Sequence, residues 1–382
     1  MQKQFQKQQP EEILCILDIG SNSCKMKVYR VSSEGYQHLE SHDVESKPHL
    51  GQMRKEEADG RTVFMLRADN MCEALRTLSS ARDNIENLRR KGYKVTVKAF
   101  GTAALRHAAN SPDFVTLANA LLFRKIDRES MKIARAFSDN NDNISDSVLD
   151  KLKSKKNLPE GMEIISGERE AELIMEGVSL VCGDTQGVVI DLGGRSCELI
   201  VLPSGESISL DIGTRVLKEM EEQSRNPDLL KNNIKTLIAD RCVAMLSDAH
   251  AHNKGILVLG GGTLKSIGLR VCEPPAVIDD FENPLDIHTF NSVLSRIIEL
   301  GDVETIARAF PGLSEKRVPD MVNTAIFMQH IITLGEFSHC VFTEKGVRDG
   351  YLKIFMNERE YPLCALPNDN PQEEKFGRNF VF

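Results

Sequence analysis

Residues 187–202 read GVVIDLGGRSCELIVL, and this stretch decides the fold of the chain. Two short apolar runs, 188–190 and 199–201, flank a polar turn with two glycines, which predicts a strand, a tight turn and a second strand. Such a turn can direct several backbone N–H groups to one point, which is how proteins hold phosphate groups. Because Asp191 carries the same sign of charge as phosphate, the turn would bind phosphate together with a metal ion.

The same pattern occurs near the start of the chain. Residues 16–28 (ILDIGSNSCKMKV) align without a gap on residues 189–201 (VIDLGGRSCELIV). A third glycine-rich turn, residues 260–263 (GGGT), follows the apolar run 256–259. One such turn alone would favour an ordinary β-hairpin. Two copies and a third glycine turn favour two similar domains that each offer a phosphate-binding loop to a shared cleft.

This arrangement resembles the superfamily of actin-like proteins, Hsp70-like chaperones and sugar kinases. The first copy, DIGSNS at residues 18–23, is similar to the turn of the exopolyphosphatase / guanosine pentaphosphate phosphohydrolase (Ppx/GppA) family. Other motifs of that family follow in order over about residues 13–355. They are GTAALRHAAN at 101–110, ISGEREA at 165–171, SLDIGTRVLKE at 209–219, RVPD at 317–320 and GVRDGYL at 346–352.

The resemblance implies an α/β fold of two related actin-like (ribonuclease H-like) domains, each with a mixed central sheet flanked by helices, and an active-site cleft between them. The N-terminal domain is expected over residues 1–165, the C-terminal domain over 166–355, and a tail over 356–382. A segment near 111–160 is atypical of the family, and it is interpreted either as a solvated helical pair or as a basic flap that guides a long anion. Apolar spacing also predicts a helix over Ala68–Arg90.

Composition narrows the possible functions. The chain has 382 residues, 41% hydrophobic and 27% charged, which suits a globular protein with a sizeable core. The net charge of −8 gives no support for nucleic-acid binding, and an anionic substrate would need a local basic path. Nine cysteines without a C-x-x-C pair argue against a disulfide framework and a zinc site. Without a secretory signal or an apolar run of membrane length, we expect a cytoplasmic protein and no membrane partner.

The resemblance also implies roles for individual residues. Glu170, on a helix expected over Ser166–Val178, is the candidate catalytic base, while Glu168 and Glu172 are expected on its solvated faces. Asp191 and Glu198 are expected to act in catalysis by holding Mg²⁺, which prefers oxygen ligands. The phosphate-binding residues would be Gly20, Ser21, Asn22, Ser23, Lys25, Arg106, Gly193, Gly194, Arg195 and Ser196. In nucleotide-binding relatives the third turn, here Gly260, Gly261, Gly262 and Thr263, faces the nucleoside.

Two positions depart from the family pattern. Arg169 stands where the family usually has Glu, and Arg195 stands where it has a third glycine. Glycine there permits positive φ or close approach to an anion, so an arginine would need a rearranged turn. Its guanidinium would then either contact the substrate phosphates, which we favour, or fill the cleft and mark a non-catalytic site.

The function implied is hydrolysis of a terminal phosphoanhydride bond in inorganic polyphosphate or guanosine pentaphosphate (pppGpp), with Mg²⁺ as cofactor. The alternative is a catalytically weakened regulatory protein that senses a nucleotide or polyphosphate with the same cleft. A kinase is disfavoured because residues 21–23 read SNS. A homodimer is possible, since dimers are common in the family.

Overall fold

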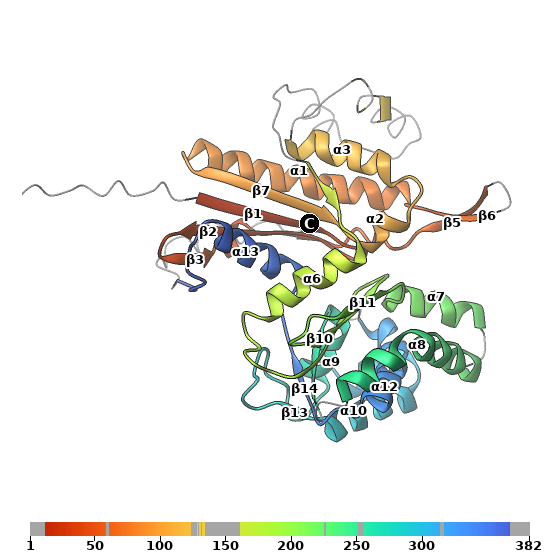
Figure 1. Cartoon of the computed structure of the whole chain (residues 1–382). Coiled ribbons are helices and arrows are strands. Elements are labelled where there is room, and N and C mark those ends of the chain that lie inside the picture. Colours follow the sequence, from red (N-terminus) through yellow and green to blue (C-terminus); the bar gives the residue numbers. More distant parts are fainter. Residues whose placement is uncertain are drawn as a thin grey trace, which may run out of the picture. The chain divides into compact units, whose positions relative to one another are not determined.

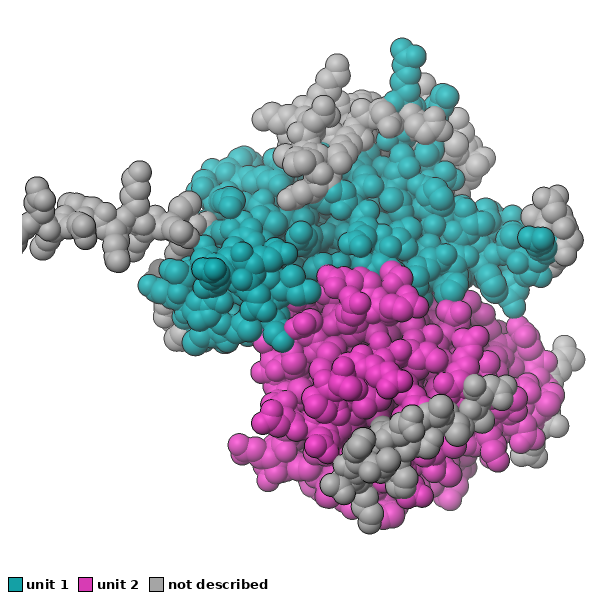
Figure 2. Space-filling view, in the orientation of Figure 1, with its two compact units in different colours: residues 1–165, 351–382 teal, residues 166–350 magenta. Residues whose placement is uncertain are grey.

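The computed structural model describes residues 12–58, 61–123, 128, 130, 132–133, 161–224, 227–250, 255–313 and 317–366 (Figure 1). The chain divides into two compact units, coloured separately in Figure 2. Unit 1 comprises Met1–Ile165 and Tyr351–Phe382, and unit 2 comprises Ser166–Gly350. The atypical segment begins with helix α3 (Ser111–Phe123), and most of its remainder lies outside the described residues, so neither interpretation of it is tested.

Unit 1 is built on a six-stranded mixed sheet in the order β3-β2-β1-β7-β8, with β4 paired to β2. Strand β1 is antiparallel to β2 and parallel to β7. Helix α1 spans Ala68–Arg90, as predicted, and packs with α3 in the core over one face of the sheet. The other elements are β1 (Glu12–Ile19), β2 (Cys24–Ser32), β3 (Gly35–His38), η1 (Glu40–His42), β4 (Val44–Ser46), β5 (Arg54–Ala58), β6 (Arg61–Met65), β7 (Lys94–Gly101), α2 (Ala103–His107) and β8 (Glu163–Ile164).

Unit 2 holds a second six-stranded mixed sheet, in the order β11-β10-β9-β12-β14-β13. Its strands are β9 (Gly187–Leu192), β10 (Cys197–Leu202), β11 (Ser207–Leu210), β12 (Ile256–Gly260), β13 (Leu285–Asp286) and β14 (His339–Phe342). Its helices are α6 (Gly167–Val178), α7 (Thr214–Ser224), α8 (Pro227–His250), α9 (Gly262–Arg270), α10 (Ile287–Leu300), α11 (Val303–Ala309), η2 (Val318–Asp320) and α12 (Met321–Gly335). The final helix, α13, spans Val347–Glu358.

The two faces of the unit 2 sheet have different partners because side chains alternate along a strand. Val188, Ile190 and Leu192 point into a large core with residues of α8, α9, α10 and α12. Val189, Ile200 and Val258 point to the opposite face, where they pack against α6. Asp191 and Glu198 share the parity of this second set, so they lie on the face that α6 covers.

The sequence repeat corresponds to a structural repeat. Strands β3-β2-β1-β7 match β11-β10-β9-β12 in spatial order, and β1 and β9 occupy the same position with the same strand directions around them. The predicted pattern of strand, turn and strand is confirmed in both copies, and so is the fold class of two mixed sheets flanked by helices.

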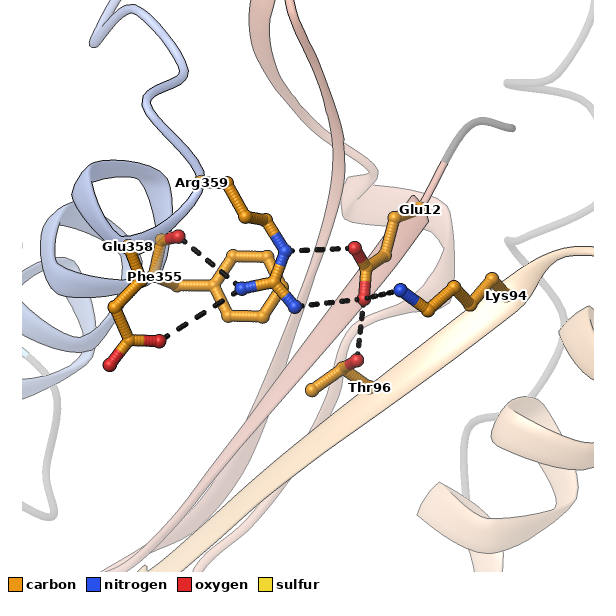
Figure 3. A network of polar contacts seen from close by, with 6 residues as sticks. All are labelled: Glu12, Lys94, Thr96, Phe355, Glu358 and Arg359. Carbon is orange, nitrogen blue, oxygen red and sulfur yellow. Dashed lines mark hydrogen bonds and ion pairs between the residues drawn. The ribbon is translucent and has the colours of Figure 1, made fainter. Parts of the chain in front are cut away.

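The C-terminal segment joins unit 1 rather than forming a separate tail from residue 356. Arg359, just after α13, makes two hydrogen bonds to Glu12 at 2.9 and 3.1 Å, and its guanidinium lies 3.4 Å from the ring centre of Phe355 (Figure 3). Thr96 also donates to Glu12, at 2.7 Å. Further on, the carbonyl of Cys364 accepts from the N–H of Tyr36, which adds the segment to the edge strand β3. The expectation of a tail therefore fails for residues 356–366.

We expect Arg359→Ala to lower the free energy of unfolding by about 3 kcal/mol, because it leaves a buried carboxylate, 5% exposed, without its principal cation. Burial raises the pKa of Glu12, but the hydrogen bonds from Arg359 and Thr96 together bring the pKa below its ordinary value. The stabilisation is therefore present at neutral pH and is lost as the pH falls through the folded-state pKa. Urea unfolding at neutral and acid pH measures both effects. Equal stability of the variant and the wild type at neutral pH would contradict this role.

Two further features concern membrane-spanning helices and the reactivity of the cysteines. No helix within the described ranges is long and apolar enough to cross a membrane. All nine cysteines are free thiols, and only Cys364 is exposed. Cys24 and Cys197, which are equivalent in the two copies, are fully buried, and burial raises the pKa of each thiol well above its ordinary value. Neither thiol is therefore suited to act as a nucleophile.

Candidate active site

The second turn, residues 193–196, is held from one side by the start of helix α7. The N–H of Gly193 donates to the carbonyl of Ser196 at 3.0 Å and closes the turn. The N–H groups of Thr214 and Arg215 donate to the carbonyls of Gly193 and Gly194 at 3.0 and 2.8 Å. In a trans peptide the N–H points opposite to the preceding carbonyl. The N–H groups of Gly194 and Arg195 therefore both point away from α7, which is the arrangement of an anion-binding turn.

The first turn, residues 20–23, has the same construction with a loop in place of a helix. The N–H of Gly20 donates to the carbonyl of Ser23 at 2.9 Å. The carbonyls of Ser21 and Asn22 accept from the N–H groups of Gly51 and His49 at 2.7 and 3.4 Å. By the same geometry, the N–H groups of Asn22 and Ser23 point away from this loop. Each unit thus carries its own turn with two N–H groups directed to one side.

Asp191 and Glu198 are direct cross-strand partners on β9 and β10. Asp191 is half-buried, whereas Glu198 is only 1% exposed. After burial itself, the charges of Glu198 and then Asp191 raise the pKa of the neighbouring Cys197 thiol. Two like charges directly opposite each other destabilise a sheet. The pair therefore favours binding of a cation.

The equivalent pair in unit 1 is arranged differently. Asp18 lies opposite Lys25, and the Lys25 ammonium lies 3.0 Å from Glu45 on β4. The charges in this row alternate across the sheet, so they neutralise one another locally. In unit 2 the row runs Ser209, Glu198, Asp191 and Gly260 across four strands, and it carries two negative charges and no positive one. The row in unit 2 therefore places two acids opposite each other, whereas the row in unit 1 places an acid opposite a base.

Glu170 lies on the buried stripe of α6. Its side chain is 8% exposed and precedes Ile174 and Val178 at the spacing of successive helical turns, so it faces the sheet with them. Helix α6 begins after Ser166, whose side chain accepts from the N–H of Arg169 as an N-cap. Glu168 and Glu172 are exposed, as expected, and Glu172 pairs with Arg169 at 2.9 Å.

The start of α6 contacts the polar row of the sheet. A side chain on Gly167 would collide with Ser209 of β11, and Ser209 Oγ donates to Glu198 Oε1 at 2.9 Å. Glu170 therefore stands at the same end of the same sheet face as Asp191 and Glu198. All three carboxylates belong to unit 2.

The two carboxylates of the acid pair suit the way in which proteins usually bind Mg²⁺. Within the described residues there is no group of three or more His, Cys, Asp or Glu side chains placed to hold a metal. Mg²⁺ usually keeps several waters and is bound through one or two carboxylates and substrate phosphates. One half-buried and one buried carboxylate beside the turn at residues 193–196 meet that requirement.

The third turn joins β12 to α9. Gly261 caps the helix with φ of 93°, a conformation that requires glycine, and a Cβ there would collide with the carbonyl of Leu192 at the end of β9. A Cβ on Gly260 would lie 2.8 Å from Asp191 Oδ1. The turn therefore lies directly beside the acid pair. Gly262 is covered by the guanidinium of Arg317, and the Thr263 hydroxyl is buried without a hydrogen-bond partner among the described residues.

The cationic side chains predicted to contact phosphate have partners within their own units. Lys25 pairs with Glu45, and Arg106 donates to the carbonyl of Ile165 at 3.0 Å. Arg195 does not adopt positive φ, so the expected backbone strain is absent. Its side chain is 6% exposed, and Nη1 lies 2.8 Å from Glu219 Oε1 of α7, a partner that the sequence did not predict. The side chain ties the turn to the helix behind it.

Sequence reasoning assigned no role to two residues that the structure places in the site, Ser209 and Glu219. They are the first and last residues of the family-like motif at 209–219, and they contact Glu198 and Arg195 respectively. The motif therefore marked both residues as candidates. The residues that they contact could not be predicted from the motif, because these lie 11 and 24 residues away along the chain.

Comparison with known proteins agrees with this architecture. The model of the Ppx/GppA phosphatase family matches residues 145–358, more than half of the chain. A guanosine-5'-triphosphate,3'-diphosphate pyrophosphatase of Vibrio parahaemolyticus is 27% identical over 203 residues, which are 45% of this chain and 41% of that relative. The match therefore spans less than half the length of this curated relative.

Solved structures show the same fold at low identity. The Ppx/GppA family member of Aquifex aeolicus superposes with a TM-score of 0.62 at 16% identity, covering 92% of this chain and all of that one. An exopolyphosphatase from Cytophaga hutchinsonii superposes with a TM-score of 0.64 at 19% identity, covering 93% of this chain and all of that one. With the family model matching more than half of the chain, including all of unit 2, and these structures sharing the fold, the chain belongs to the Ppx/GppA phosphatase family.

Proposed function

We propose that this protein hydrolyses terminal phosphoanhydride bonds and releases phosphate from inorganic polyphosphate or pppGpp. The observation that carries the proposal is the pair of opposed carboxylates, Asp191 and Glu198, beside a turn whose N–H groups point to one side. Family membership supports it, because the family is one of phosphatases. A structural β-hairpin would have no need of two like charges opposite each other on a covered face.

In this proposal Glu170 accepts the proton of the attacking water. A buried carboxylate on a rigid helix can hold a water in one orientation, and a positioned base contributes typically 10²–10⁴-fold to a rate. The N–H groups of Gly194 and Arg195 would bind oxygens of the phosphoryl group and stabilise charge as the bond breaks. The Ser196 hydroxyl would add a donor to phosphate oxygens.

Asp191 and Glu198 would hold Mg²⁺, directly or through its waters. When bound, the ion would neutralise charge on the phosphate oxygens. The residues themselves keep the turn and the acid pair in a fixed relation, because β9 and β10 are joined by that turn. The third turn, at Gly260–Thr263, lies beside Asp191 and is proposed to accommodate a nucleoside when pppGpp is the substrate.

The experiment that tests the proposal is phosphate release from polyphosphate and from pppGpp, measured side by side with and without Mg²⁺. We expect release from at least one substrate, and we expect it to require the metal. The Vibrio relative is named for a guanosine substrate and the Cytophaga protein for polyphosphate, so both belong in the assay. Absence of release from both substrates with Mg²⁺ present would reject the proposal.

A regulatory protein without turnover is the second candidate. The arginine at position 195 kept this alternative open from the sequence, since its side chain could fill a phosphate site. In the structure the Arg195 side chain pairs with Glu219 of α7, within unit 2. Tight binding of pppGpp or polyphosphate together with failed hydrolysis would restore this alternative.

A further inference from the structure

We infer that Ser209 is a positioning residue for Glu198, and that Gly167 is glycine so that Ser209 can take this position. The inference rests on the proposed function in one respect, that Glu198 holds a cation. To the proposed function it adds one residue of β11 and one residue of α6, and neither of them touches substrate or metal.

The first observation is the hydrogen bond itself. Ser209 lies directly opposite Glu198 on the neighbouring strand, and its hydroxyl donates to Oε1 at 2.9 Å. A hydrogen bond to a charged acceptor is stronger than one between neutral groups. Glu198 is 1% exposed, so solvent cannot replace this donor readily. The bond therefore restrains the carboxylate of Glu198 beside Asp191.

The second observation is the close approach of α6. A Cβ built on Gly167 would collide with both Cβ and Oγ of Ser209. Gly167 has no positive φ, so its backbone conformation does not require glycine. The requirement is one of space, because the first residue of α6 rests on the serine. The helix that carries Glu170 is thus seated on the residue that orients Glu198.

These contacts connect the base and the acid pair through one serine. Side chains that hydrogen-bond to metal-ligating carboxylates typically change metal affinity by 10–100-fold when they are removed. We therefore expect Ser209→Ala to weaken Mg²⁺ binding about tenfold. Gly167→Ala should weaken it in the same direction, because the new methyl group displaces the serine while leaving its hydroxyl in the chain.

Ser207→Ala is the matched control. Ser207 lies on the same strand and the same face as Ser209, is also half-buried, and is paired with Ile200 instead of an acid. Substitution there removes the same atom from the same strand. It should leave Mg²⁺ binding unchanged within twofold.

The measurement is the Mg²⁺ concentration dependence of the melting temperature, taken on the full chain without substrate, alongside the Mg²⁺ dependence of phosphate release. In a Glu198→Gln background, Ser209→Ala should add no further loss of the Mg²⁺ response, because both changes act through one carboxylate. An unchanged Mg²⁺ response in Ser209→Ala, or an equal loss in Ser207→Ala, would overturn the inference. If Ser209→Ala does not fold, Gly167→Ala decides the matter by the same criteria.

Hydrolysis and the role of Ser209 can be rejected independently of each other. A wild-type protein that is stabilised by Mg²⁺ but releases no phosphate would reject the proposed hydrolysis and leave the role of Ser209 intact. A wild-type protein that releases phosphate but shows no stabilisation by Mg²⁺ would reject the inference and leave hydrolysis intact.

Discussion

Glu170→Gln is expected to lower kcat for phosphate release by about a hundredfold or more, the usual scale for loss of a positioned general base. Glutamine has the size of glutamate and can still bind a water, but it cannot accept the proton. The side chain lies on the buried stripe of α6 rather than on its solvated face, so substrate binding through the turns should change little. Steady-state phosphate release, with KM and kcat determined separately, measures the effect.

Glu168→Gln is the control for this result. Glu168 lies two residues away on the same helical turn, carries the same charge and is exposed. It should retain the wild-type kcat. If Glu170→Gln hydrolyses substrate at the wild-type rate while folding normally, Glu170 is a structural residue of the helix and another group accepts the proton.

The sequence predicted the parts of this protein that depend on local pattern. Helix α1 could be placed because Met71, Leu75, Leu78 and others repeat at helical spacing. The two strand-turn-strand units could be placed because they repeat without a gap, and the same strand order then forms around each. Glu170 could be singled out because it occupies the position of the acid before Ala in the family motif, and helical geometry then placed Glu168 and Glu172 on other faces.

The parts that escaped prediction depend on contacts between distant residues. Arg359 binds Glu12 across 347 positions, and no periodic pattern relates them, so residues 356–366 were expected to form a tail. Arg195 was interpreted from its place in the turn alone, and Glu219 appears beside it only when α7 packs behind the turn. The contrast between Lys25 and Glu198 was visible in the aligned copies. Its meaning depended on the strand register, which places each residue opposite an aspartate.

The charge difference between the two copies predicts that one substitution stabilises the metal-free protein and yet weakens its stabilisation by Mg²⁺. Glu198→Gln should raise the free energy of unfolding without metal by about 1 kcal/mol, because it removes one of two opposed like charges from a buried row. Glutamine can still accept the hydrogen bond from Ser209, so the row keeps its packing. The variant should nonetheless lose most of its stabilisation by Mg²⁺, which for the wild type would be about 2.7 kcal/mol at a concentration of 100 Kd. Its phosphate release should fall in parallel.

Asp18→Asn supplies the matched control in the other copy. Asp18 lies opposite Lys25, so neutralising it removes an attraction instead of a repulsion and should lower the stability of unit 1. It should leave the stabilisation by Mg²⁺ unchanged, because the cation site is assigned to unit 2. Thermal unfolding of both variants across a Mg²⁺ titration decides the question. If Glu198→Gln keeps the wild-type Mg²⁺ response, or if Asp18→Asn loses it, then the opposed acids are not what binds the metal, and the two copies of the turn do not differ in the way that their charges indicate.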